Sequence, residues 1–204
     1  KTKEHIDSVT EQLHWIPIIQ QAIKKDNFFL TGQKIINLAD SQCKKMEVLL
    51  RLDSDKVYPP GHFIPIAERY HIITDIDKWV LNEVLQQKHL LEQGIELSIN
   101  ISGESFIKES FVDYAEQLVK SIPEYAHLIC FEITETSAIL QVEATQKFIS
   151  RLKQLGCKFA LDDFGTGTSS YGQLKELPVD YIKVDGIFVR GIEEDKINQM
   201  MVES

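Results

Sequence analysis

The sequence lacks the features that mark several classes of protein. It has three cysteines, Cys43, Cys130 and Cys157, widely spaced and without a C-x-x-C pair. That pattern disfavours a disulfide framework or a zinc ribbon and suits a reducing cytoplasm. There is no signal peptide, and no apolar run reaches the roughly 18–20 residues that span a membrane. Basic residues are in the minority, 22 against 31 acidic ones, and a net charge of −9 disfavours nucleic acid as a partner.

What the chain does have is typical of a globular domain. Its 204 residues are 43% hydrophobic and 26% charged, enough for a sizeable core. Because the sequence begins with Lys1 and ends inside a helical pattern at 192–204, we expect a piece of a longer protein. Residues 1–25 look helical, with an interruption expected near Pro17.

Beyond residue 25, β-rich runs alternate with helical runs. This order favours a mainly parallel sheet with helical crossovers. The predicted strands are Phe28–Asn37, Lys45–Leu52, Glu96–Ser102, Leu128–Glu135, Lys158–Phe164 and Tyr181–Val189. The predicted helices are Asp75–Gln93, Glu109–Ser121, Ser137–Leu155 and Gly191–Ser204.

Five of these strands carry polar groups on one face and apolar groups on the other. In the segment at 98–102, for example, Ser98, Asn100 and Ser102 alternate with Ile99 and Ile101. An open doubly wound sheet has two apolar faces, whereas a barrel places polar residues at the carboxyl ends of its strands, where active sites lie. The pattern favours an α/β barrel. An α/β sheet whose polar strand ends simply meet solvent is the alternative.

In a barrel, five oxygen-bearing residues would converge at one mouth: Glu47, Asn100, Glu132, Asp162 and Asp163. Four carboxylates this close repel unless they bind protons or cations. Oxygen ligands without His or Cys favour hard ions such as Mg²⁺, Mn²⁺ or Ca²⁺. Two such ions about 3.5–4 Å apart are a common device for cleaving phosphodiesters.

Each of these residues also has a purely structural interpretation. Asp162 and Asp163 are typical of a turn or a helix cap. The two glutamates fit salt bridges with Lys or Arg, and Asn100 fits a hydrogen-bonded core amide. Lys183 fits a side chain that extends to the surface. The glycines at 165–167 are too few for a nucleotide-binding fingerprint. These alternatives stay open on the residues alone.

Six motifs, in order along the chain, resemble those of one protein family. They are E-V-L-L-R at 47–51, F-I-P-I-A-E at 63–68, N-I-S at 100–102, E-I-T-E at 132–135, D-D-F-G-T-G at 162–167 and P-V-D-Y-I-K-V-D at 178–185. From about residue 15 onward, the chain resembles the EAL domain of bacterial cyclic di-GMP phosphodiesterases.

The resemblance implies a modified (β/α)8 TIM-like barrel that hydrolyses cyclic di-GMP to pGpG with Mg²⁺ or Mn²⁺ in a two-metal site, and with Ca²⁺ inhibitory. It implies metal ligands at Glu47, Asn100, Glu132, Asp162 and Asp163. It implies catalytic roles for Lys183, Asp163 and Glu135, and ligand contacts at Gln33, Leu49 and Arg51. Lys183 would bind the attacking water or the phosphate, Arg51 would hold a phosphate, and Glu135 would brace the loop at 162–167.

The chain departs from the family pattern in two kinds of place. Val48 replaces the middle Ala of the signature and should point away from the mouth, Lys34 replaces a Pro, and Thr168 stands where an aromatic residue is common. The family's last two strands, which carry a further metal-binding Glu, would follow Ser204. We therefore expect a helical linker from an upstream domain and entry to the barrel at 1–25, and a C-terminally incomplete EAL domain at 26–204, its barrel lacking two strands.

Three functions remain to be separated. The first is a cyclic di-GMP phosphodiesterase, the second an inactive EAL-type receptor that signals to a partner or attached domain, and the third a dimerisation module. The resemblance further implies cyclic di-GMP as ligand, a homodimer, an upstream sensor or GGDEF domain in the same chain, and no nucleic acid. It implies a cytoplasmic domain, with a membrane anchor elsewhere in the protein as an open alternative.

Overall fold

A seven-stranded sheet forms the centre of the molecule, in the order β1–β2–β4–β5–β6–β7 with β3 paired to β2. The computed structural model describes residues 2–25, 27–166 and 177–203, and within them all side chains except those of residues 2–13 and 201. The strands are β1 (Phe28–Ile36), β2 (Cys43–Asp53), β3 (Val57–Tyr58), β4 (Glu96–Asn100), β5 (Ile129–Thr134), β6 (Lys158–Phe164) and β7 (Tyr181–Val184).

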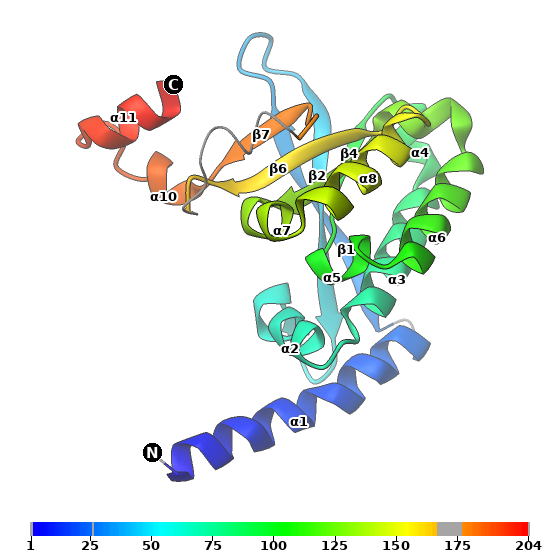
Figure 1. Ribbon diagram of the computed structural model, residues 1–204, viewed down its shortest axis with the longest axis vertical. Helices are drawn as coiled ribbons and strands as arrows, with labels where there is room; N and C mark the ends of the chain where they lie inside the picture. The colour runs from blue at the N-terminus through cyan, green and yellow to red at the C-terminus, as the bar shows by residue number, and fades with distance from the viewer. Residues whose placement is uncertain (1, 26, 167–176, 204) are drawn as a thin grey trace.

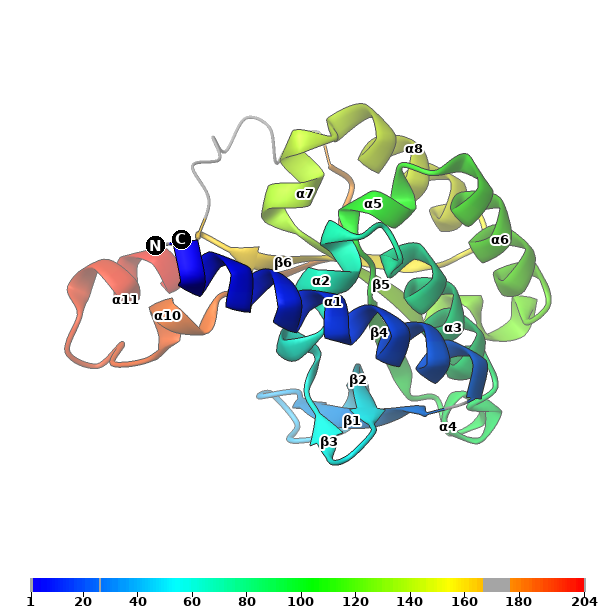
Figure 2. The same ribbon diagram turned by 90° about the horizontal axis from the view of Figure 1, so that it is seen from below.

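Helices cover one face of this sheet, and both ends of the chain lie outside that layer (Figure 1). The helices are α1 (Thr2–Lys25), α2 (Ile64–Arg69), α3 (Ile73–Leu85), α4 (Lys88–Glu92), α5 (Gly103–Phe106), α6 (Glu109–Lys120), α7 (Glu135–Leu140), α8 (Val142–Lys153), α10 (Gly186–Val189) and α11 (Lys196–Glu203). Two 3₁₀ helices lie at Pro60–His62 and Pro123–Leu128. Seen from below, α3, α5, α6, α7 and α8 lie on the same side of the strands (Figure 2). Among the described residues, none of the helices has the length and hydropathy to cross a bilayer.

The strand directions identify the sheet as part of a barrel. Strands β2, β4, β5, β6 and β7 run parallel, and β1 is antiparallel to β2. The described sheet is open, with β1 at one edge and β7 at the other. Parallel strands joined by helical crossovers on the outer face are the arrangement of a TIM-like barrel. The predicted α/β barrel is therefore confirmed, with part of its strand ring present.

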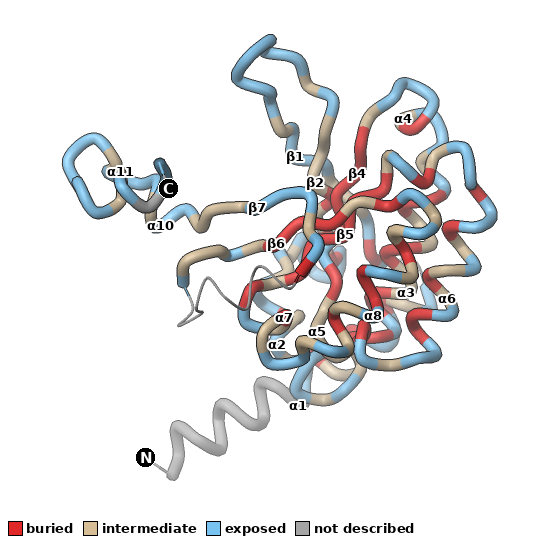
Figure 3. Tube along the Cα trace, turned by 45° about the horizontal axis from the view of Figure 1, so that its top comes forward, coloured by how far each residue is buried: buried red, intermediate tan, exposed pale blue. Residues whose placement is uncertain are grey.

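The two faces of the strands differ as the alternation predicted. On the outer face, Leu97, Ile99, Phe131, Ile133, Phe159 and Leu161 are all fully buried under the helices. The inner face carries the polar positions of the same strands. Burial is concentrated in β4, β5 and β6 and in the helices over them, while the β1–β2 hairpin tip, α10 and α11 are mostly exposed (Figure 3).

An aromatic cluster fixes the helix layer to the outer face. Phe148 of α8 contacts Phe106, Phe131 and Phe159 at ring-centroid distances of 5.8, 5.6 and 5.5 Å. Aromatic contacts of this kind add about 0.5–1.5 kcal/mol each beyond the area they bury. The cluster therefore holds α5 and α8 against β5 and β6, the strands that carry three of the predicted metal ligands.

Several predicted elements differ from the observed ones. The predicted interruption near Pro17 is wrong, because α1 continues through it. Trp15, Ile19 and Ala22 are buried against the domain and hold the helix on both sides of the proline. The predicted strand at 181–189 is wrong in its second half, because Asp185 accepts a hydrogen bond from the backbone N–H of Ile187 at 2.7 Å and starts α10.

Two predicted helices are each divided in two. The break between α3 and α4 lies at residues 86–87, and that between α7 and α8 at Gln141, whose φ of −135° and ψ of 45° are not helical. Elements β3, α2 and α5 were not predicted. Short elements of two to six residues carry too little periodicity to be recognised from the sequence.

Candidate active site

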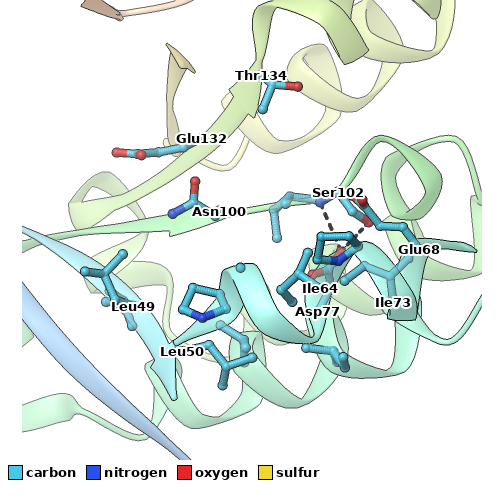
Figure 4. Close-up of a pocket in the computed structure, with 17 residues that line it drawn as sticks. Leu49, Leu50, Ile64, Glu68, Ile73, Asp77, Asn100, Ser102, Glu132 and Thr134 are labelled. Carbon is cyan, nitrogen blue, oxygen red and sulfur yellow. Dashed lines mark hydrogen bonds between the residues drawn. The ribbon is translucent and has the colours of Figure 1, made fainter. Parts of the chain in front are cut away.

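Five predicted site residues lie together toward the carboxyl ends of the parallel strands, with Glu47 in the middle of the longer strand β2. We call Glu47 (β2), Asn100 (β4), Glu132 (β5), Asp162 (β6) and Lys183 (β7) the mouth cluster. The register explains why they meet: Asn100 is paired with Glu132 on the neighbouring strand, and Figure 4 shows their side chains next to each other. Each comes from a different strand, so the sheet itself sets their relative positions.

The ammonium group of Lys183 lies at the centre of this cluster. Its Nζ is 3.1 Å from Glu47 Oε2 and 3.1 Å from Asp162 Oδ2, and it also bonds Glu132 Oε2. Asn100 Nδ2 donates to Glu47 Oε1 at 2.9 Å. The salt-bridge interpretation of Glu47 and Glu132 is thus partly right, since both pair with Lys183.

One lysine does not neutralise the mouth cluster. Three carboxylates against one ammonium leave an excess of two negative charges. Burial raises the pKa of Glu132, and the nearby charge of Glu47 raises it further, against the opposing effect of Lys183. Burial alone would lower the pKa of Lys183, but Glu132, Asp162 and Glu47 raise it above its ordinary value, so the lysine stays charged.

The donor atoms present fit a divalent cation. Carboxylate oxygens of Glu47, Glu132 and Asp162 all lie within 4.8 Å of one another. Among the described residues, the buried Oε1 of Glu132 has no hydrogen-bond partner, which is unusual for a charged atom away from water. An all-oxygen set with an unpartnered carboxylate atom matches the chemistry of Mg²⁺ or Mn²⁺ rather than zinc.

Asp163 is next to this group but is not one of its three converging carboxylates. Its backbone has a φ of 54°, in the left-handed region, at the irregularity where β6 and β7 lose register. Its N–H donates to Asp162 Oδ1 at 2.9 Å. Burial raises the pKa of Asp163, and so do the charges of Asp162 and Asp185. The side chain therefore has two acidic neighbours, and the charge of Lys183 partly offsets their effect.

Glu135 lies against the segment that follows Asp162. The side chain is buried, and its Oε2 accepts a hydrogen bond from the backbone N–H of Gly165 at 2.9 Å. Thr166 Oγ1 also donates to the carbonyl of Asp163 at 2.9 Å. These bonds anchor the segment that follows Asp162, while Gly167 lies outside the described residues.

The three predicted ligand-contact residues lie on β1 and β2. Gln33 is exposed and pairs in register with Glu47. Leu49 and Arg51 follow Glu47 on the same strand face by alternation. Arg51 Nη1 donates to the carbonyl of Leu50 at 2.8 Å.

A cavity of about 380 Å³ opens beside the mouth cluster. Asn100, Glu132 and Thr134 line its side toward the cluster. Its remaining wall is largely apolar and includes Leu49, Ile64, Pro65, Ile73 and Ile76. Figure 4 shows this wall, with α3 beneath it and Asp77 pointing toward Ser102. A mainly apolar cavity next to a charged centre is typical of a small-molecule site.

Two contributors to this region were not predicted from the sequence. Asp185 acts on Asp163, and its position on the same strand face as Lys183 was a signal that it lies at the mouth. Asp77 is 5% exposed and bonds Ser102. A single Asp within a helical pattern gives no sign of such a contact.

Comparison with known proteins identifies the family. A family model described as the EAL domain matches residues 17–204. The chain belongs to the EAL domain family. The resemblance drawn from the six motifs is thereby confirmed.

Curated relatives of this EAL domain are longer proteins. It is 40% identical over 198 residues to the cyclic di-GMP phosphodiesterase PdeB of Shewanella oneidensis, covering 93% of the chain and 23% of that protein. It is 35% identical over 193 residues to the cyclic di-GMP phosphodiesterase PdeA of Borreliella burgdorferi, covering 91% and 28%. The chain spans about a quarter of the length of these relatives.

Solved structures show the same fold. The PaMucR phosphodiesterase in complex with c-di-GMP matches with a TM-score of 0.84 at 27% identity, over 93% of this chain and 79% of that one. The FimX EAL domain from Pseudomonas aeruginosa, bound to c-di-GMP, matches with a TM-score of 0.82 at 28% identity, over 92% and 77%. The EAL domain described here therefore has the strand and helix arrangement of its family.

Proposed function

We propose that this EAL domain hydrolyses cyclic di-GMP to pGpG. The observation that carries the proposal is the convergence of Glu47, Glu132 and Asp162 within 4.8 Å, beside Asn100 and Lys183. Relatives 40% and 35% identical are named cyclic di-GMP phosphodiesterases, which supports this substrate. In the reaction, a water oxygen bonds to phosphorus, the P–O3′ bond breaks, and the 3′ oxygen takes a proton.

The metal assignment follows from the donor atoms. Glu47, Asn100, Glu132 and Asp162 would hold one ion, and Asp163 would contribute to a second. When bound, Mg²⁺ or Mn²⁺ supplies a water of lowered pKa and counters charge on the phosphate. Ca²⁺ accepts longer bonds and more ligands, so it is expected to occupy the cluster without supporting turnover.

The remaining residues bind and orient. Lys183, held in its charged form by three carboxylates, would donate to a phosphate oxygen or to the attacking water. Arg51 would hold the second phosphate, because a guanidinium matches phosphate geometry. Gln33 and Leu49 would contact the ligand from β1 and β2, and the apolar cavity would accept a base and exclude water from the mouth.

Glu135 would act through the backbone. By accepting from Gly165 N–H, its buried carboxylate fixes the chain that follows Asp162 and Asp163. Two adjacent acidic residues that both serve metal ions need a fixed backbone between them. Glu135 would therefore be a support for the second ion rather than a proton carrier.

The proposal extends to the protein in which this domain works. We expect the protein to be a homodimer and this domain to be cytoplasmic. We also expect an upstream sensor or GGDEF domain in the same chain, joined to the EAL domain through residues 1–25. A membrane anchor would belong to that upstream region. A relative in Pseudomonas aeruginosa, 30% identical over 201 residues, is named a bifunctional diguanylate cyclase/cyclic di-GMP phosphodiesterase. Because that relative combines both activities in one protein, it supports the expectation that this EAL domain is linked to a cyclase domain.

Chromatography of cyclic di-GMP incubated with the protein tests the proposal. We expect pGpG to appear with Mg²⁺ or Mn²⁺ and not with EDTA or Ca²⁺. Glu47→Gln should abolish product, while Glu143→Gln, on the exposed surface of α8, should not. Intact cyclic di-GMP that still binds would establish a receptor instead, and neither binding nor hydrolysis would contradict both functions.

A further inference from the structure

The segment that carries Asn100 leaves its strand along a path fixed by three contacts. The side chain of Asn100 donates to Glu47 at 2.9 Å. The backbone N–H of Ile101 donates to the carbonyl of Glu132 at 2.9 Å. The third contact, at Ser102, comes from outside the sheet, and it therefore decides how the chain turns from β4 into α5.

That third contact is made by Asp77 of α3. Its Oδ2 accepts from the backbone N–H of Ser102 at 3.1 Å and from the Ser102 hydroxyl at 2.7 Å (Figure 4). Ser102 Oγ in turn accepts from Ser105 N–H and caps α5. One carboxylate oxygen thus holds both the backbone and the side chain of the residue two positions after Asn100.

The buried carboxylate of Asp77 lowers the stability of the fold. Burial raises the pKa of Asp77 to about 6, although the hydrogen bonds from Ser105 and Ser102 oppose the rise. A buried charge held by neutral donors contributes less to stability than a well-packed apolar group would. Its presence at the wall of the cavity therefore calls for a role beyond stability.

We propose that Asp77 is a positioning residue that, through Ser102, orients the amide of Asn100 toward the mouth cluster. The role rests on the proposed function in so far as Asn100 is a metal ligand. Residues that hold metal ligands from behind typically change metal affinity roughly 10–100-fold when removed. Asp77 itself touches neither the cation nor the substrate.

The geometry allows the role of the accepting oxygen of Asp77 to be tested apart from the role of its negative charge. Because both bonds from Ser102 go to the same oxygen, the carbonyl oxygen of Asn at position 77 can accept both. Asp77→Asn should therefore keep the orientation of Asn100, and Asp77→Ala should lose it. Ser102→Ala keeps the backbone bond alone and should fall between them.

Thr74 provides a matched control on the same helix. Its hydroxyl is buried and accepts from Ser105 Oγ at 3.3 Å and from Lys108 Nζ at 2.9 Å. Thr74→Val removes a buried polar group of the same network without touching residues 100–102. Any effect of Asp77→Ala that comes from general loss of stability should appear in Thr74→Val as well.

The first test is NMR of the side-chain amide of Asn100 in protein labelled with ¹⁵N-asparagine, without any metal. We expect Asp77→Ala to shift or broaden this pair of resonances, and Asp77→Asn and Thr74→Val to leave them in place. An unchanged Asn100 amide in Asp77→Ala would overturn the proposal, whatever the protein catalyses.

The second test is Mn²⁺ affinity, measured by electron paramagnetic resonance. Asp77→Ala should weaken it about tenfold in the wild-type background and not at all in an Asn100→Ala background. An equal loss in both backgrounds would contradict action through Asn100. If the wild-type protein binds no Mn²⁺, the proposed function fails, and the amide resonances still decide the role of Asp77.

Discussion

The two ends of the same five strands hold buried charge in opposite ways. At the amino ends, a base cluster is formed by Lys45, Glu96, Cys130, Lys158 and Tyr181, again one residue from each strand. Glu96 is bonded there by Lys45 at 2.8 Å, by Lys158 at 2.5 Å and by the Tyr181 hydroxyl at 3.1 Å. Lys45 also lies 3.6 Å from the centroid of the Tyr181 ring.

The balance of charge is reversed between the two clusters. The base cluster gives one carboxylate two ammonium groups, and the mouth cluster gives three carboxylates one. Burial would raise the pKa of Glu96, but hydrogen bonds from Lys158 and Lys45 lower it overall, whereas the pKa of Glu132 is raised. A carboxylate paired with two ammonium groups is a structural support, and one that shares a single ammonium with two other carboxylates is available to a cation.

Removing a mouth carboxylate should have the largest effect on activity. Glu132→Gln is expected to lower kcat by about 10³-fold, because it removes a charged ligand from the reaction centre. In EDTA the variant should be at least as stable as the wild type, since the raised pKa of Glu132 means that the fold favours its neutral form. Steady-state kinetics and urea denaturation measure the two effects.

Removing the carboxylate of the base cluster should lower stability and leave activity unchanged. Glu96→Gln is expected to cost about 1–3 kcal/mol of stability, because it leaves two half-buried ammonium groups without a counter-charge. Measured below its unfolding temperature, the folded fraction should keep its kcat. A variant that unfolds like the wild type, or that stays folded and inactive, would remove the distinction between the clusters.

Asp77 sharpens the comparison, because it is a buried carboxylate of another kind, one held by neutral donors. The pKa of Asp77 in the folded protein is about 6, above its ordinary value of 3.8. Asp77 therefore contributes its full stabilisation below pH 3.8 and loses it as the pH rises through about 6. Asp77→Asn does not titrate. Its stability relative to wild type should therefore rise by about 2 kcal/mol between about pH 4 and about pH 7.

That prediction is tested by urea unfolding of both proteins across this pH range. Thr74→Val serves as the control, because it leaves Asp77 in place. Its free energy of unfolding should change with pH in the same way as that of the wild type. A constant difference between Asp77→Asn and wild type at every pH would show that the folded and unfolded pKa values are the same.

The smallest effect is expected at the edge of the mouth cluster. Glu135→Gln retains an oxygen that accepts from Gly165 N–H, so kcat should fall less than about tenfold, and Glu135→Ala roughly 10–100-fold. The measurement is kcat as a function of Mn²⁺ concentration for both variants. Equal losses in Glu135→Gln and Glu135→Ala would show that the carboxylate acts by its charge and not by holding the loop.

The sequence predicts the mouth cluster better than the base cluster, for a physical reason. At the mouth, Asn100, Asp162 and Lys183 stand out because each interrupts an apolar strand and belongs to a recognisable motif. At the base, Lys45 and Lys158 look like ordinary charged residues at strand starts. Their partner Glu96 is found only from the strand register, which a single sequence does not specify.

Contacts made at a distance were likewise beyond sequence reasoning. The strands and their faces follow from local alternation, and five of the six predicted strands begin within one residue of the observed position. Continuation of α1 through Pro17 depends on burial of Ile19 against the domain, and the Asp77–Ser102 contact depends on how α3 packs under β4. Both are tertiary effects that override local preference.

We expect the mouth cluster to bind a divalent cation and the base cluster not to bind one. The decisive experiment is a titration of Mn²⁺ followed by electron paramagnetic resonance, on the wild type, Glu132→Gln and Glu96→Gln. Saturable binding should occur in the wild type and in folded Glu96→Gln, and should be lost in Glu132→Gln. Binding that survives Glu132→Gln, or no binding to the wild type, would show that the mouth cluster is not the cation site.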